Sequence, residues 1–257
     1  MAFAELKYFS KALEKATAAD ILLPESRLEG PFPVLYLLHG LSDDQTMWQR
    51  RTSIERYVQN LPLIVVMPDG GRGFYSDAEQ GMAWETAIVR DLVDYVDTLF
   101  RTKATREGRC VAGLSMGGYG AAKFALKYPE RFCGGVSHSG ALGFGHRTMK
   151  PAADNRWATE FARIVGENPV GGENDLYALA AKLAPDKRPA LRIDCGTGDF
   201  LLDDNRAFHA YLDTLGFAHE YEEHPGGHDW AYWDKHIQET LAFFTPLLGL
   251  TAPGDVK

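Results

Sequence analysis

The sequence predicts an α/β fold, with a mostly parallel central sheet and helices on both of its faces. Short runs of apolar and β-branched residues recur along the 257 residues, and a helical pattern follows most of them. The middle runs are apolar nearly throughout, as expected for parallel strands that are buried on both faces. Strands that alternate with helices over the whole length form a doubly wound sheet.

The individual elements follow from these patterns in chain order. The first 24 residues are expected to form an antiparallel hairpin at the edge of the sheet. Further strands are expected at residues 34–38, 63–67, 109–112, 134–137, 191–195 and 219–223. Apolar residues at helical spacing predict helices over residues 85–100, 205–215 and 237–248.

One stretch interrupts this alternation. Residues 141–189 separate the sixth expected strand from the seventh, which is far longer than an ordinary crossover. The stretch contains prolines, glycines and two helical pieces near residues 157–165 and 175–183. We therefore expect a cap inserted above the sheet, within a single domain that covers residues 1–257.

Composition and charge argue against several classes of protein. A formal net charge of −8 disfavours binding to nucleic acid or to anionic membranes. No apolar run reaches the roughly 18 residues of a membrane span, and the N-terminus has an acid where a signal peptide needs basic residues. Cys110, Cys133 and Cys195 lie in or beside expected strands, which fits a reducing compartment. We expect a cytoplasmic protein, and the oligomeric state stays open, with a homo-oligomer among the alternatives.

A serine lies between glycines at the point where an expected strand meets a helix. Residues 113–117 carry the pattern G-x-S-x-G, directly after the apolar run at 110–112 and before a helix-forming stretch at 121–127. Strand, turn and helix in this order are the context of a nucleophile elbow. Because the turn is so tight, the residues two before and two after the serine must lack side chains. Ser115 is therefore the candidate nucleophile.

A serine hydroxyl needs a base to remove its proton and a third group to orient that base. For this type of elbow, the acid and then the histidine follow the serine along the chain. Asp199 follows the expected strand at 191–195, and His228 follows the strand at 219–223. Because the carboxyl ends of parallel strands meet at one edge of a sheet, we expect the three side chains to converge there.

Other acids and histidines compete for these roles. Asp203 and Asp204 start the next expected helix, where solvated acids are common, and they remain alternatives for the acid. Asp194 lies inside an expected strand, so its carboxylate is not expected to reach over the sheet edge. His138 follows too soon after Ser115 to leave room for an acid between them.

Two backbone N–H groups are needed to stabilise the alkoxide that forms during acyl transfer. Met116 directly follows the nucleophile and is the first candidate. Leu41 is the second, because Gly40 lets the backbone turn inward after the strand at 34–38. His39 is expected to brace this loop rather than act as a base. An ordinary strand-to-helix turn also fits these residues, but it leaves the His-Gly pair unexplained.

Separated motifs also carry a family resemblance over about residues 5–245. They are LHGLS at 38–42 with PDGGR at 68–72, GLSMGGYGA at 113–121, CGTGDF at 195–200 and PGGHDW at 225–230. With them the chain resembles the esterase D-like branch of the α/β hydrolases. This branch includes tributyrin and acetyl esterases, feruloyl and acetyl-xylan esterases, S-formylglutathione hydrolases and mycolyltransferases. The resemblance implies an α/β-hydrolase fold and a triad of Ser115, Asp199 and His228.

Departures from individual subfamilies narrow the implied substrate. S-formylglutathione hydrolases usually lack the His-Gly pair, and the mycolyltransferases and carbohydrate-targeted relatives usually carry leaders or binding modules. The implied function is a serine carboxylesterase that acts on small esters with short acyl groups, without a metal or other cofactor. The alternatives are an acyltransferase, an S-formylglutathione, feruloyl or acetyl-xylan esterase on the same triad, and a non-catalytic binding module.

Large apolar residues near these motifs are candidates for an acyl or alcohol pocket, although such residues are equally often packing anchors. They are Trp48, Phe74, Tyr75, Trp84, Leu142, Phe144, Trp157, Phe200 and Trp230. Arg72 and Glu85 are expected to form structural ion pairs near the site.

Overall fold

The computed structural model describes residues 1–25, 29–151 and 154–250. Within them, eight strands form one sheet in the order β1-β2-β4-β3-β5-β6-β7-β8. The strands are β1 (Ala2–Ser10), β2 (Lys15–Leu23), β3 (Val34–Leu38), β4 (Ile64–Pro68), β5 (Arg109–Leu114), β6 (Gly134–His138), β7 (Ala190–Gly196) and β8 (Glu220–His224). β2 pairs antiparallel with β1 and with β4, and the other neighbours are parallel. The predicted mostly parallel sheet with an antiparallel hairpin at its edge is confirmed.

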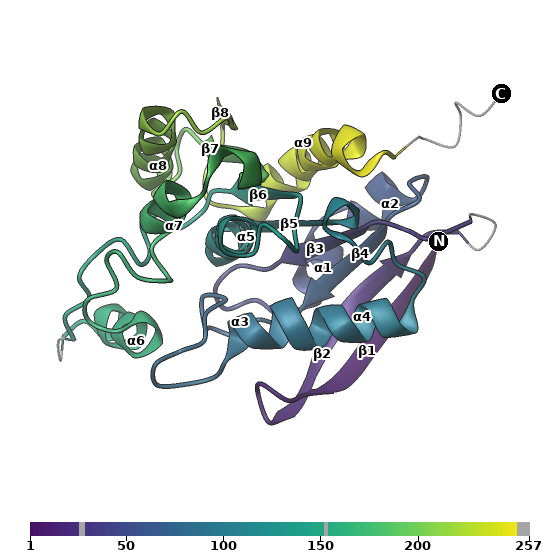
Figure 1. The fold of residues 1–257 in the computed structure, drawn as a ribbon, viewed down its shortest axis with the longest axis horizontal. Coiled ribbons are helices and arrows are strands. Elements are labelled where there is room, and N and C mark those ends of the chain that lie inside the picture. The colour runs from purple at the N-terminus through teal and green to yellow at the C-terminus, as the bar shows by residue number, and fades with distance from the viewer. Residues whose placement is uncertain (26–28, 152–153, 251–257) are drawn as a thin grey trace.

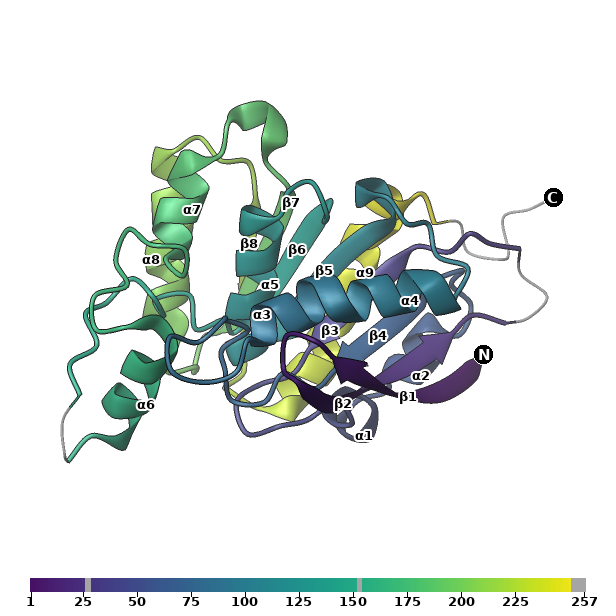
Figure 2. The same ribbon diagram turned by 60° about the horizontal axis from the view of Figure 1, so that its bottom comes forward.

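Helices cover both faces of the sheet (Figure 1). They are α1 (Met47–Arg51), α2 (Ile54–Val58), α3 (Trp84–Thr86), the π-helical η1 (Ala87–Leu92), α4 (Val93–Leu99), the 3-10 turn η2 (Arg106–Gly108), α5 (Met116–Lys127), α6 (Arg156–Val165), α7 (Leu176–Lys182), the 3-10 turn η3 (Pro185–Lys187), α8 (Leu202–Thr214) and α9 (Trp230–Leu248). The run from α3 to α4 and α5 lie in front of the sheet in Figure 2, and α9 lies behind it. Among the described residues, no helix has the length and apolar character needed to cross a membrane.

The alternation of side chains along the central strands explains the two-sided core. In β3, Val34, Tyr36 and Leu38 belong to a cluster that includes α5 and α8, whereas Leu35 and Leu37 join a cluster that includes α1 and α9. All five side chains are fully buried. Because successive residues of a strand point to opposite faces, a strand between two helical layers must be apolar at every position.

Some helices differ from the predicted ones at their boundaries. α9 begins at Trp230, well before the expected start at residue 237. Its N-cap is Asp229, whose side chain accepts a hydrogen bond from the backbone N–H of Tyr232 at 3.0 Å. Trp230 and Trp233 continue the apolar spacing upstream of Ile237, so the helix extends back to this cap. The helix expected at residues 85–100 is present, with a π-helical segment in its middle.

The expected cap lies between β6 and β7 and contains α6, α7 and η3. Both expected helical pieces are present, within a few residues of their predicted bounds. α7 packs beside α8, on the same side of the sheet as α5. α6 stands at one end of the molecule, apart from the helices that cover the sheet (Figures 1 and 2). Of the two cap helices, α7 is thus packed into the helical layer of the sheet, whereas α6 lies apart from it.

A buried ion pair joins α3 to α5. The Lys123 ammonium lies 2.6 Å from a carboxylate oxygen of Glu85, and the two side chains are 0% and 2% exposed. Lys123 also donates hydrogen bonds to the carbonyl of Tyr75, the hydroxyl of Ser76 and the side-chain oxygen of Asn174. Burial lowers the pKa of Lys123 to about 8. One ammonium therefore holds the loop after β4 and the cap against α5.

Replacing Glu85 by glutamine is expected to destabilise the fold. Removing one partner of a buried ion pair leaves the other charge uncompensated, which costs about 3–5 kcal/mol. We expect the midpoint of thermal unfolding to fall by about 10 °C, measured by circular dichroism. Glu173→Gln is the matched control, because Glu173 pairs with Lys127 at the surface with 81% of its side chain exposed. Similar shifts for the two variants would contradict the special role of the buried pair.

Candidate active site

Ser115 occupies a sharp turn between β5 and α5. Its backbone has φ 54° and ψ −116°, a strained conformation for a residue with a side chain. A Cβ at Gly113 would lie 2.4 Å from the carbonyl oxygen of Gly117, and a Cβ at Gly117 would lie 2.5 Å from the carbonyl oxygen of Leu38. Both positions therefore require glycine. The pentapeptide has the geometry of a nucleophile elbow.

The structure brings Ser115, His228 and Asp199 together from three separate loops. Nε2 of His228 lies 2.9 Å from the Ser115 hydroxyl oxygen. Nδ1 of the same ring lies 3.0 and 2.9 Å from the two carboxylate oxygens of Asp199. The carboxylate is completely buried, whereas the imidazole is 18% exposed. With Nδ1 donating to the carboxylate, Nε2 is left to accept the serine proton.

The carboxyl group of Asp199 is held in its ionised form. Burial by itself would raise its pKa, but hydrogen bonds from His228, the Leu201 amide and the Ser139 hydroxyl hold the pKa below its ordinary value. The Leu201 N–H donates to this carboxylate at 2.8 Å. Aromatic rings flank the imidazole, with the centroid of Phe200 4.4 Å away and that of Trp233 5.0 Å away.

Main-chain hydrogen bonds continue past the strand ends and link the loops of this site. The Ser115 N–H donates to the carbonyl of His138, at the end of β6, at 2.9 Å. Ser139 donates in the same way to the carbonyl of Asp194 in β7. The Gly198 N–H, beside Asp199, donates to the carbonyl of Gly226 at 2.8 Å. Backbone contacts thus connect the segments that carry the three side chains.

The competing histidine and aspartate form a pair of their own. Nδ1 of His138 lies 2.9 Å from a carboxylate oxygen of Asp194, and its Nε2 lies 2.7 Å from the Thr240 hydroxyl. Both side chains are fully buried in the sheet. Asp204 forms an ion pair with Arg147 instead. None of these groups contacts the Ser115 hydroxyl among the hydrogen bonds of the described residues.

The loop after β3 lies against the serine. A Cβ at Gly40 would come within 2.6 Å of the Leu114 side chain and 3.7 Å of the Ser115 Cβ. Leu41 lines the same cavity as Ser115. Met116 is the first residue of α5 and is buried. The two residues expected to supply N–H groups to an oxyanion therefore both lie beside the serine.

His39 braces this loop through both of its ring nitrogens. Nδ1 lies 2.7 Å from the carbonyl oxygen of Gly40, and Nε2 accepts a hydrogen bond from the Gly70 N–H at 2.9 Å. The Tyr75 hydroxyl donates to the His39 carbonyl, also at 2.9 Å. His39 therefore ties the loops after β3 and β4 together and has no nitrogen free to act as a base.

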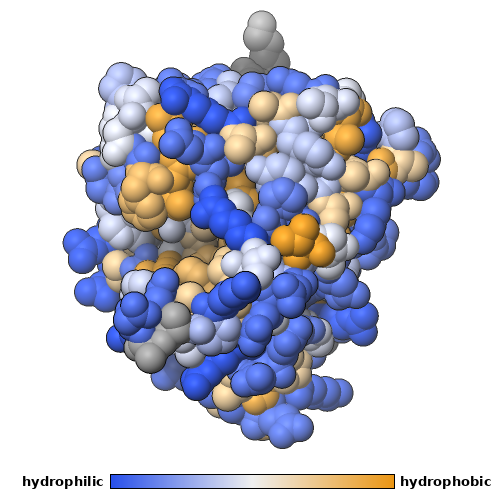
Figure 3. All heavy atoms as spheres, turned by 90° about the vertical axis from the view of Figure 1, so that its left-hand side faces the viewer, coloured by the Kyte–Doolittle hydropathy of each residue, from blue (hydrophilic) through white to orange (hydrophobic). Residues whose placement is uncertain are grey.

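A mainly apolar cavity of about 290 Å³ opens beside Ser115. Three of its residues form a packed aromatic wall, in which the ring centroids of Phe74 and Phe144 are 3.9 Å apart and those of Phe74 and Phe161 are 4.9 Å apart. Trp157 and Phe200 also line it, and they are 51% and 77% exposed. Figure 3 shows apolar side chains gathered around a hollow on this end of the molecule. Phe161 enters from the cap helix α6 and was not among the predicted pocket residues.

Comparison with known proteins identifies the family. A sequence model described as "Putative esterase" matches residues 10–244. The chain belongs to this esterase family. An acetyl esterase of Caldicellulosiruptor saccharolyticus is 31% identical, over 95% of this chain and 98% of the relative. The resemblance inferred from the motifs is confirmed, and the esterase is a carboxylic ester hydrolase.

Solved structures agree with this assignment. The fluorophosphonate-binding serine hydrolase FphF of Staphylococcus aureus is 33% identical to the esterase, with a TM-score of 0.84 over 95% of this chain and 98% of the other. The S-formylglutathione hydrolase FrmB of the same species is 35% identical, with a TM-score of 0.82 over the same shares. The fold of the esterase is therefore that of the α/β hydrolases.

Four aromatic residues proposed for the pocket do not line the cavity beside Ser115. Trp48 is buried and donates from its indole nitrogen to the carbonyl of Leu38, with Trp230 packed edge-on against it. Tyr75 is fully buried under the loop that carries His39. Trp84 lies beneath Gly73, where a Cβ would come within 2.3 Å of the indole. In the esterase these four side chains have packing roles, and Phe144, Trp157 and Phe200 lie where a pocket was expected.

Two clusters in the described part of the esterase bring three metal-ligand side chains together. One contains His209, Asp213 and His219, and the other contains His224, His236 and Glu239. The second has a competing cation, because Arg192 lies 2.7 Å from the Glu239 carboxylate. Neither cluster contains a member of the Ser115, His228 and Asp199 array.

Proposed function

We propose that the esterase hydrolyses small carboxylic esters with short acyl groups, with Ser115, His228 and Asp199 as its catalytic triad. The observation that carries this proposal is the position of His228, whose imidazole bridges the Ser115 hydroxyl and the Asp199 carboxylate at 2.9 Å on each side. This arrangement supplies a nucleophile, a base and an orienting acid in one chain of hydrogen bonds.

The chemistry proceeds in two steps. The Ser115 oxygen attacks the ester carbonyl while Nε2 of His228 takes its proton, and the imidazolium then protonates the leaving alcohol. The Leu41 and Met116 N–H groups stabilise the alkoxide of the tetrahedral intermediate. Asp199 holds the imidazole in the required tautomer and stabilises its charged form. A water molecule activated by His228 then cleaves the acyl-enzyme, and this route requires no metal or organic cofactor.

The cavity supports a short acyl group. It has a volume of about 290 Å³, and packed phenylalanine rings form its wall. An ion pair between Arg147 and Asp204 also borders it, so the cavity does not continue as an apolar tunnel there. A short aliphatic chain can be buried from water within this cavity, whereas a long chain must extend beyond it. The relative named acetyl esterase points in the same direction.

A series of p-nitrophenyl esters from acetate to palmitate tests the substrate class. We expect kcat/KM to be highest for acetate to butyrate and to fall for long chains, because one methylene that does not fit changes kcat/KM by about tenfold or more. An optimum at decanoate or beyond would contradict the proposed acyl site.

Phe161→Ala is expected to shift this preference toward longer acyl groups, because it removes one ring from the cavity wall. The ratio of kcat/KM for hexanoate to that for acetate should rise by about tenfold. Phe243→Ala is the matched control, since Phe243 is also a partly buried helical phenylalanine but packs on the opposite face of the sheet. An unchanged ratio in Phe161→Ala, or an equal change in both variants, would place the acyl group elsewhere.

A thioester is the second candidate substrate, because a structural relative at 35% identity is named an S-formylglutathione hydrolase. The ratio of kcat/KM for S-formylglutathione to kcat/KM for p-nitrophenyl acetate decides between a thioester and an ester as the preferred substrate. Added alcohol distinguishes hydrolysis from acyl transfer through the products.

The single domain over residues 1–257, a cytoplasmic location and the absence of nucleic-acid partners stay predictions from the sequence.

A further inference from the structure

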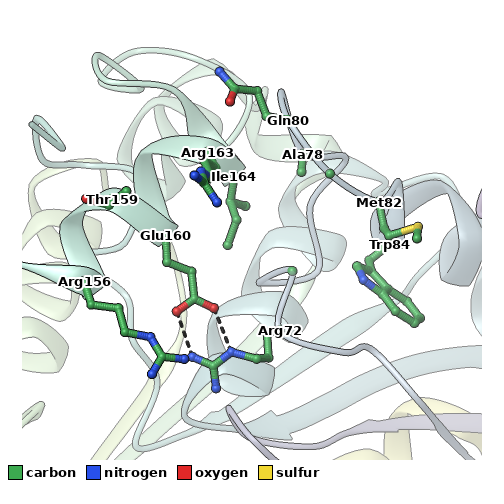
Figure 4. Close-up of a pocket in the computed structure, with 12 residues that line it drawn as sticks. Arg72, Ala78, Gln80, Met82, Trp84, Arg156, Thr159, Glu160, Arg163 and Ile164 are labelled. Carbon is green, nitrogen blue, oxygen red and sulfur yellow. Dashed lines mark hydrogen bonds and ion pairs between the residues drawn. The ribbon is translucent and has the colours of Figure 1, made fainter. Parts of the chain in front are cut away.

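Arg72 contacts two separate walls of the active site at once. It follows β4, in the loop braced by His39. Its Nε and Nη2 donate to the two carboxylate oxygens of Glu160 on α6 at 2.7 and 2.8 Å, as the dashed lines in Figure 4 show. Its Nη1 donates to the hydroxyl of Ser42 at 2.9 Å. Ser42 directly follows Leu41, the proposed oxyanion donor.

The cap helix α6 lies between two cavities. Trp157 and Phe161 line the cavity beside Ser115. Other residues of α6, among them Arg156, Glu160 and Arg163, border an open cavity of about 600 Å³ on the side shown in Figure 4. On that side α6 borders open volume instead of packed core. Since close packing is what fixes a helix in place, α6 depends there on specific polar contacts.

Those polar contacts are distributed along the helix. Near its C-terminus, the backbone N–H groups of Glu79 and Gln80 donate to the carbonyls of Ile164 and Arg163 at 3.0 and 2.9 Å. In its middle, the fork of Arg72 and Glu160 is a polar contact to the loop after β4, beside the packing of Phe161 against Phe74. The Arg72 guanidinium also lies 5.4 Å from the ring centre of Trp157. Arg72 therefore holds the part of α6 that carries the wall of the Ser115 cavity.

The contact with Ser42 acts on the oxyanion loop. Ser42 has φ 76°, a left-handed conformation that is unfavourable for a residue with a side chain. A hydrogen bond to its hydroxyl helps to hold that conformation. Because Ser42 and Leu41 share a peptide bond, a change at Ser42 reorients the backbone next to the Leu41 N–H.

We propose that Arg72 is a positioning residue that couples the cap helix α6 to the oxyanion loop, so that the acyl cavity and the oxyanion donor are set together. The inference rests on the proposed function of Ser115, because it concerns the geometry around that serine. Arginine suits this role, since its planar fork holds a carboxylate with two N–H groups and keeps a further donor for Ser42. Lysine has one ammonium and cannot reproduce the fork and the Ser42 contact together.

Arg72→Lys tests the coupling. We expect kcat for p-nitrophenyl acetate to fall by about 10- to 100-fold, as is typical when a supporting residue lets a reacting group shift. The discrimination between acetate and hexanoate should also weaken. Ser42→Ala should lower kcat while keeping the acyl-length profile, and Glu160→Gln should change the profile while largely keeping kcat for acetate. The double variant Arg72→Lys with Glu160→Gln should be no worse than Arg72→Lys alone, because Glu160→Gln weakens a contact that Arg72→Lys has already broken.

Arg206→Lys is the matched control. Arg206 makes the same two-pronged contact with Glu223, at 2.8 and 2.7 Å, between α8 and β8. We expect its kcat and acyl-length profile to stay within about twofold of the wild type. Circular dichroism establishes that each variant is folded, and Ser42→Ala and Glu160→Gln test the two halves of the inference if Arg72→Lys does not fold.

The outcomes separate the inference from the proposed function. If Arg72→Lys keeps both kcat and the acyl-length profile while Ser115→Ala is inactive, the coupling is wrong and the triad stands. A further outcome is that Ser42→Ala and Glu160→Gln each change both kcat and the acyl-length profile, by amounts that follow the drop in unfolding temperature. In that case Arg72 has a general structural role and the coupling is also wrong. If Ser115→Ala remains active, the proposed function itself fails.

Discussion

Ser115→Ala is expected to lower kcat for p-nitrophenyl acetate by roughly 10⁵- to 10⁶-fold, the loss seen when the nucleophile of such a triad is removed. The alanine leaves His228 and Asp199 in position but supplies no oxygen to form the acyl-enzyme. The remaining groups can only assist direct attack by water. The measurement is the initial rate at saturating substrate, on protein purified from a host that lacks other esterases.

Ser53→Ala is the matched control for this experiment. Ser53 precedes α2, on the face of the sheet opposite α5, and it is expected to leave kcat within about twofold of the wild type. Equal losses in both variants would point to a fault of preparation. A Ser115→Ala enzyme with more than about a hundredth of wild-type kcat would rule out Ser115 as the nucleophile.

Asp199→Asn is expected to lower kcat by about 10⁴-fold with little change in KM. The carboxylate accepts the Nδ1 proton of His228, whereas an asparagine can present its NH₂ group and favour the tautomer with the proton on Nε2. Nε2 could then no longer accept the serine proton.

Because the pKa of Asp199 is held below its ordinary value, the wild-type carboxylate stays ionised at neutral pH. The ionised carboxylate contributes to the stability of the folded protein above the ordinary pKa of an aspartate. This contribution is lost as the pH falls through the lowered pKa of Asp199.

Asp203→Asn tests one of the two acids, Asp203 and Asp204, that the sequence left open as alternatives to Asp199. Asp203 lies in the first turn of α8 and is exposed. We expect its replacement to change kcat by less than about twofold. The opposite pattern, with full activity in Asp199→Asn and a large loss in Asp203→Asn, would transfer the orienting role to Asp203.

The central strands and the elbow could be predicted because their signals are local. A strand between two helical layers must be apolar at nearly every position, and this shows directly in residues 34–38 and 110–112. The elbow needs glycine at 113 and 117 because no side chain fits there. These requirements depend on a few neighbouring residues, so the sequence displays them without knowledge of the rest of the fold.

The pocket could be predicted only in part because the direction of a loop side chain depends on distant partners. Trp48 and Phe200 both lie near the motifs, yet Trp48 turns inward to donate to the Leu38 carbonyl and Phe200 stays exposed beside His228. Phe161 belongs to a cap helix whose position relative to the sheet has no local signal. The pairing of His138 with Asp194 was missed for the same reason, since they lie 56 residues apart in sequence.

The main-chain hydrogen bonds between the loops of Ser115, Asp199 and His228 have a consequence for redesign. They involve N–H and carbonyl groups that every non-proline residue possesses, so exchanging side chains around them leaves this framework intact. The cap residues that border the cavity are attached separately, by side-chain packing and by the fork of Arg72. Mutant libraries confined to the cap and the cavity wall can therefore vary the substrate range while the geometry of Ser115, His228 and Asp199 stays unchanged.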